Sequence, residues 1–228
     1  MSDQSPLEWL PSKGWIVLSG RADPLSEIRA QALSRHNASG AIAYITLADD
    51  LGDELMDDMA ELGAASGYLV DLEEQDNNEI YERLSGAAMI VVDADGQGGR
   101  LLRLLRRTAI HALKEALQRG ALILLEGAAA AITGEFVLTA DGRIESGLNL
   151  LKNALVATDV SGLAGDQALR AARSELPDAL FVGLATGSAL VLGPEGQIET
   201  WGERQVAINL ADPMRAKSAF GRLSVIEN

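Results

Sequence analysis

The stretch that decides the fold is GALILLEGAAAAITG, residues 120–134. Its first half is an apolar run, typical of a strand that is covered on both faces. Gly127 and four alanines follow directly, and small residues of this kind let a helix begin abruptly against a sheet. Such a turn holds up a nucleophile when the turn residue carries a hydroxyl. Residues 126–131 carry none, so the turn can also be a plain helix start, which alanine favours.

The residues before this stretch repeat the same unit of strand and helix. Apolar runs rich in Val, Ile and Leu alternate with segments of helical spacing. We expect strands at 15–20, 40–48, 67–72, 87–94 and 121–127, and helices at 24–36, 50–63, 77–85 and 99–119. This alternation predicts a parallel sheet with right-handed crossovers. The expected fold class is therefore α/β, a three-layer αβα sandwich with a flavodoxin-like, mostly parallel sheet.

The pattern changes after Ala131. Residues 136–146 predict a hairpin with Asp141-Gly142 as its turn, and residues 166–176 predict one more helix. Short apolar runs then follow one another closely. We expect a β-rich C-terminal part that is antiparallel and completes the sheet. No linker rich in Pro, Gly or Ser separates the two parts, so we expect a single α/β domain over residues 1–228.

Composition and charge narrow the classes of function. The net charge of −14 argues against nucleic acid and anionic membrane surfaces as partners. The chain has no cysteine, which excludes disulfides and thiolate chemistry. No apolar run approaches the roughly 20 residues of a membrane span, and the first residues lack the basic and apolar pattern of a secretory signal. We expect a cytoplasmic protein.

The charged residues gather in three segments. Acidic residues at helical spacing over 49–61 and 71–82 are typical of solvated helix faces. The segment 100–119 alternates leucines with Arg103, Arg106 and Arg107, which predicts an amphipathic helix with a basic outer face. These arginines could face the acidic helix 50–63 of a second copy. A homodimer is therefore expected.

The binding site is expected where the strands end. In an open α/β sheet, ligands bind at the carboxyl ends of the strands. This rule selects Ser19-Gly20, Ala48-Asp49, residues 93–99 and residues 126–131. The loop DADGQGGR, residues 93–100, is rich in glycine and opens a helix. It can favour an anion, or it can be only a tight strand-to-helix turn.

At this point the chain resembles the cyanophycinase and dipeptidase E family of serine peptidases, whose fold is related to class I glutamine amidotransferases. The family carries a strand followed by Gly-Thr-Ser-Ala-Gly-Ala-Ala. Without gaps, its threonine falls on Glu126 and its nucleophilic serine on Gly127; a shift of one residue puts the serine at Ala128. Neither register supplies a hydroxyl. The segment 147–160 resembles the stretch that ends in Asp-Gln-His-Phe, which places the catalytic histidine at Asp159.

The resemblance extends to three further segments. Residues 15–20 are similar to the family's opening strand and di-glycine turn. Gly96 and Gln97 match its Gly-Gly-Asn-Gln segment, and Thr108 matches a threonine of the following helix. Ala185 and Thr186 stand in place of an acidic pair. The ligand-binding residues that the resemblance implies are Gly96, Gln97, Glu126, Gly127, Ala128 and Asp159.

No other residue is expected to rescue catalysis. A serine nucleophile needs a base within hydrogen-bond reach. His36 should lie at the opposite edge of the sheet, and His111 in the middle of the long helix. Thr133 and Ser188 are closer to the turn, but neither has a base.

We therefore expect a non-catalytic homologue of these peptidases that binds an unknown small molecule or peptide, without a cofactor. The alternative is an active hydrolase or peptidase of the same family with an unrecognised mechanism. Asp93, Asp95, Glu126 and Asp159 should face one cleft. Such an oxygen-rich cluster suits Mg²⁺, Ca²⁺ or an amine. Alternatively, some of these carboxylates point into solvent or cap backbone N–H groups.

Overall fold

The computed structural model describes residues 7–21, 26–36, 40–47, 49–160, 163, 166–202 and 206–209. The main sheet in this part of the chain has the strand order β12-β11-β2-β6-β5-β3-β4. Five of its strands are parallel: β2 (Trp15–Ser19), β3 (Ile42–Ile45), β4 (Gly67–Leu69), β5 (Met89–Asp93) and β6 (Leu122–Glu126). Two are antiparallel: β11 (Ser188–Leu192) and β12 (Ile198–Gly202).

Helices cover both faces of this sheet. Leu122 and Leu124 of β6 pack in one cluster with residues of α1 (Glu27–Arg35) and α2 (Asp49–Glu61). Ile123 and Leu125 of the same strand pack in another cluster with α3 (Asn77–Gly86), α4 (Gly98–Leu104) and α5 (Ile110–Arg119). Successive residues of a strand point to opposite faces, which explains the continuous apolar runs. The expected three-layer αβα arrangement with a mostly parallel sheet is confirmed.

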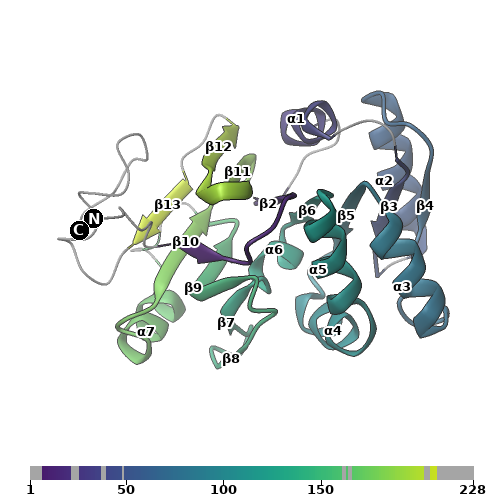
Figure 1. The fold of residues 1–228 in the computed structure, drawn as a ribbon. Helices are drawn as coiled ribbons and strands as arrows, with labels where there is room; N and C mark the ends of the chain where they lie inside the picture. The colour runs from purple at the N-terminus through teal and green to yellow at the C-terminus, as the bar shows by residue number, and fades with distance from the viewer. Residues whose placement is uncertain are drawn as a thin grey trace.

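Most of the C-terminal strands belong to a second sheet, which lies beside the main sheet in Figure 1. The order is β13-β10-β9-β7-β8, and β1 pairs with β9. The strands are β1 (Glu8–Trp9), β7 (Gly134–Leu138), β8 (Ile144–Ser146), β9 (Leu151–Thr158), β10 (Leu180–Leu184) and β13 (Val206–Asn209). The helix α7 (Gln167–Glu175) precedes β10.

The expectation of one antiparallel continuation is therefore wrong in part. Only β11 and β12 extend the main sheet antiparallel, while β9 pairs parallel with both β7 and β10. The sequence pattern predicts no strand at the position of β9, which is the centre of the second sheet. Crossovers through α7 make the parallel pairing of β9 and β10 possible. The hairpin expected at 136–146 is present as β7 and β8.

The long helix expected at 99–119 is interrupted. The segment η1 (Leu105–Ala109) between α4 and α5 is a π-helix, in which the Ile110 N–H donates to the Leu105 carbonyl. The Arg106 guanidinium donates to the carbonyl oxygens of Ser146 (2.6 Å) and Gly147 (3.0 Å). Arg106 therefore binds carbonyl groups of its own chain, whereas the sequence predicted a contact with the acidic helix of a second copy.

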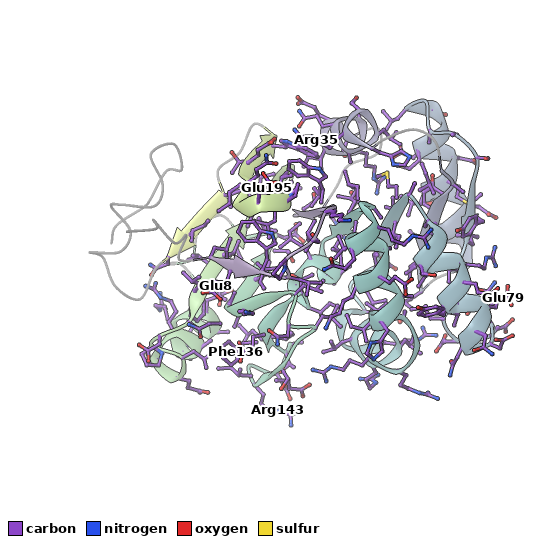
Figure 2. All side chains as sticks on the ribbon, viewed as in Figure 1. Glu8, Arg35, Glu79, Phe136, Arg143 and Glu195 are labelled. Atoms are coloured by element: carbon purple, nitrogen blue, oxygen red, sulfur yellow. The ribbon has the colours of Figure 1, made fainter. Side chains whose placement is uncertain are left out.

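The end of α1 is fixed to the strands beside it. The Arg35 guanidinium pairs with Glu199 (2.7 Å) and lies 4.3 Å from the ring centre of Trp15. Figure 2 shows Arg35 at the end of α1, on the side of β12. Cation–π contacts of this kind add stability beyond the ion pair.

Within the described ranges, no helix combines the length and apolarity that crossing a bilayer requires.

Candidate active-site cleft

A cleft of about 680 Å³ lies at the carboxyl ends of β5, β6 and β9. Its floor includes the β5 loop with Asp93, Asp95 and Gly96, and the β6 turn with Glu126, Gly127 and Ala128. One wall is α2, which contributes Glu54, Asp57, Asp58 and Glu61. Asp159, Arg21 and Arg29 complete the charged part of the lining. The cleft thus occupies the edge of the sheet where ligands bind in open α/β folds.

The turn after β6 has an unusual backbone conformation at Gly127. Its φ is 51° and its ψ is −122°, a region that L-residues with a side chain rarely adopt. The Gly127 N–H donates to the Ser19 carbonyl (3.0 Å), which ties the turn to the end of β2. The short helix α6 (Ala128–Ala131) begins immediately afterwards. This is a sharp strand-to-helix turn of the kind that presents a nucleophile.

The space beside this turn is open. A Cβ atom placed on Gly127 would meet no heavy atom within 4 Å. The gap-free register places the family's serine at Gly127, where φ is positive. The register shifted by one residue places this serine at Ala128, the first residue of α6.

Glu126, one residue earlier, is buried and paired. Its carboxylate accepts hydrogen bonds from Arg29 Nη2 (2.7 Å) and Arg29 Nε (3.1 Å to Oε2). The third nitrogen of the same guanidinium, Nη1, contacts Asp58 of α2. Arg29 therefore joins three elements: α1, α2 and β6. A bidentate guanidinium–carboxylate pair of this kind fixes orientation as well as charge.

Burial dominates the protonation of this group. Burial raises the pKa of the Glu126 carboxyl above its ordinary value, and the nearby charges of Asp93 and Asp58 act in the same direction, while Arg29 opposes them. Burial lowers the pKa of Arg29, but Glu126 and Asp58 outweigh it and raise the pKa overall. Burial also raises the pKa of the Tyr44 phenol to about 12.

Asp159 is held at the rim of the cleft by two hydrogen bonds. Its Oδ1 accepts from the Arg21 backbone N–H (2.8 Å) and from the Thr186 hydroxyl (3.1 Å). Its φ of 58° is positive, which Asp tolerates better than most residues. Asp159 therefore connects the end of β9 with the segment that follows β2 and with the loop that joins β10 to β11.

The four carboxylates expected around a cation all line the cleft, but they do not converge. Glu126 turns to Arg29, and Asp159 turns to Arg21 and Thr186. Asp93 accepts from the Asp95 backbone N–H (2.9 Å). Among the described residues, no group of three or more His, Cys, Asp or Glu side chains could hold a metal ion. Of the two alternatives, the described residues favour the one in which these carboxylates bind other groups, since Asp93 and Asp159 each accept from a backbone N–H, and they do not support a Mg²⁺ or Ca²⁺ site.

The remaining expected site residues lie in different places. Gly96 lines the cleft. Gln97 instead precedes α4 as its N-cap residue, and its Oε1 accepts from Arg100 (3.0 Å). The backbone of Thr108 lies in the π-helix, and Ala48 lies outside the described residues.

The side chains considered for a rescue of catalysis are placed as expected. His36 is buried at the end of α1, and its Nε2 has no hydrogen-bond partner among the described residues. His111 is exposed on α5. The buried hydroxyls of Thr133 and Ser188 donate to the carbonyls of Ala130 and Ala185, each at 2.7 Å. Among the described residues that line the cleft, none is a histidine.

Sequence reasoning missed Arg29, Asp58 and Arg21. Arg29 is separated from Glu126 by 97 positions, so no local spacing reveals the pair. The acids of α2 have the spacing of a solvated helix face, and Glu54, Asp57 and Glu61 are indeed exposed. They also line the cleft, which only the placement of α2 beside β6 could show.

Neither protein-family models nor curated proteins match this sequence. Solved structures do match. A peptidase from an acI-B1 actinobacterium superposes with a TM-score of 0.70 at 16% identity, over 90% of this chain and 94% of that one. A peptidase E candidate from Listeria monocytogenes EGD-e superposes with a TM-score of 0.62 at 14% identity, over 84% and 99%. At these identities the likeness shows the fold: the chain has a peptidase E-like α/β fold.

Proposed function

We propose that this chain is a non-catalytic relative of serine peptidases of this fold, and that it binds a ligand in the cleft. The observation that carries the proposal is Gly127. Its backbone has the sharp turn of a nucleophile site, yet the residue has no side chain. The resemblance places the family's serine at this residue in the gap-free register and at Ala128 in the register shifted by one; in either case the turn has kept its form without the hydroxyl.

The position of the family's base supports the same proposal. Asp159 stands there, and its carboxylate is engaged by Arg21 and Thr186. An aspartate carboxylate can accept hydrogen bonds, but it is a much weaker base for a serine hydroxyl than the imidazole of a histidine. Loss of the nucleophile alone typically costs about a millionfold in rate.

The ligand is expected to be a small molecule or a peptide. The cleft volume of about 680 Å³ lies within the range of roughly 300–1,000 Å³ that is usual for such sites. The proposed binding of this ligand involves no cofactor.

The purified protein is expected to show no serine-peptidase activity. A fluorophosphonate probe should give no labelling that is lost on heat denaturation, and a panel of β-aspartyl dipeptides and fluorogenic peptides should not be hydrolysed. The Gly127→Ser variant should also remain unlabelled, because no described histidine lines the cleft. Heat-sensitive labelling or turnover by the native chain would instead support an active hydrolase with an unrecognised mechanism.

A homodimer remains a prediction. The acidic α2 packs on one face of the main sheet and the basic α4–α5 segment on the other. A contact between these two surfaces would be heterologous and would extend head to tail unless its rotation closed a ring. Light scattering measures the molar mass in solution. A mass near 24.1 kDa, that of one chain, at tens of micromolar protein would contradict the homodimer.

A further inference from the structure

We propose that Arg29 is a latch that sets the width of the cleft, by holding the α2 wall against the β6 turn. The latch is a property of the fold, so it does not depend on whether the cleft binds a ligand or performs catalysis.

The first argument is the geometry of the guanidinium. Arg29 uses Nε and Nη2 for Glu126 on the cleft floor, and Nη1 for Asp58 on the cleft wall. The side chains of Glu126, Arg29 and Asp58 are only 2%, 9% and 11% exposed. Charges interact far more strongly away from water than at a surface. One side chain therefore ties the wall to the floor.

The second argument is that α2 carries charges that oppose its position. Asp53, Glu54, Asp57 and Glu61 are exposed on this helix, and they repel one another and the acids of the floor. Its last turn contains Glu61 and no basic residue, which is unfavourable at the negative end of the helix dipole. Without Arg29, electrostatic repulsion would favour a movement of α2 away from Asp93 and Asp95.

The third argument is the location of α2 at the side of the sheet. It packs over β3 and β4, and β4 is the edge strand. Leu55 and Met59 anchor it to the apolar layer. An element over a sheet edge has fewer neighbours to resist displacement, and such elements open at lower free energy than the core. Release of Arg29 would therefore widen the cleft without unfolding the sheet.

The absence of cysteine from the chain allows a direct test. Spin labels are placed at Glu61→Cys on the wall and Asp95→Cys on the floor, both exposed, and the distance distribution is measured by double electron–electron resonance. With Arg29 present, we expect a single narrow distribution. With Arg29→Met, we expect a longer mean distance and a broader distribution. The control pair Glu82→Cys and Asp95→Cys, which places one label on α3, should not change.

Hydrogen exchange separates a latch from a general loss of stability. In Arg29→Met, the amides of α2 should accelerate at least about tenfold more than those of α5, beyond the acceleration that the general loss of stability gives to both helices. Arg29→Lys, which keeps the charge but cannot bridge two carboxylates in the same way, serves if the methionine variant does not fold, and should show an intermediate width. Unchanged distances in both variants, or equal acceleration of α2 and α5, would overturn the latch.

Discussion

Arg29→Met is expected to lower the free energy of unfolding by about 3–5 kcal/mol at neutral pH, because it leaves a buried carboxylate without its partner. Glu126 is 1% exposed, and Asp58 and Asp93 already act against its charge. The measurement is urea denaturation followed by circular dichroism at pH 7.5.

The cost of this substitution should shrink as the pH falls. In the native chain the pKa of Glu126 is already raised by burial, against the opposing effect of Arg29. Without Arg29 that pKa rises further. A carboxyl whose folded pKa lies above its unfolded pKa contributes stability below the unfolded value and loses it as the pH rises through the folded value. The variant should therefore be closest to the native chain near pH 5 and furthest from it above neutrality.

Two variants control for the loss of packing. Glu126→Gln should cost only about 1 kcal/mol, because Arg29 keeps its partner Asp58 and loses one hydrogen-bonded charge. The double variant Arg29→Met/Glu126→Gln should be more stable at neutral pH than Arg29→Met alone, with a weaker pH dependence. If the single and double variants unfold at the same denaturant concentration at every pH, the buried charge is not the cause.

Gly20→Ala is expected to destabilise the protein by about 1–3 kcal/mol and to distort the cleft rim. A Cβ atom on Gly20 would lie 2.2 Å from the Ala185 carbonyl oxygen, which belongs to the backbone and cannot turn aside. The displaced turn carries Thr186, which donates to Asp159. Urea denaturation measures the stability, and the amide exchange of residues 185–187 reports the local distortion.

Gly86→Ala is the matched control. A Cβ atom on Gly86 would meet nothing within 4 Å, and the residue ends α3, where alanine has the higher helix propensity. Its stability should be unchanged or slightly higher. Equal midpoints for the two variants would contradict the close approach at Gly20.

The parallel half of the fold was predictable because its inner strands are buried on both faces, and only the edge strand β4 is half-buried. The runs around Val17, Val91 and Leu124 are continuous in apolar character, and helices with clear spacing separate them. The second sheet was less predictable. The segment of β9 contains Lys152 and Asn153, both exposed, and this breaks the apolar run that signals a strand. Its parallel pairing depends on partners far away in the sequence.

The candidate site, like the fold, was predictable from the sequence only in part. The turn at Glu126-Gly127 could be located because a buried strand and a run of small residues mark it locally. The role of Glu126 could not be predicted, because it depends on Arg29 and Asp58, which reach it only after α1 and α2 fold back over the sheet. The sequence shows that an ionisable residue, Glu126, ends an apolar strand, but it does not show that Arg29 is the partner of this carboxylate.

The π-helix between α4 and α5 should allow the chain to lose one residue at this position. A π-turn contains about one residue more than an α-turn, so η1 absorbs one residue without rotating the flanking helices. Leu101 before it and Leu113 after it both pack into the same core. A relative one residue shorter here would keep both leucines in place with a regular helix. It would lose the π-turn that contains Arg106, whose guanidinium donates to the carbonyls of Ser146 and Gly147.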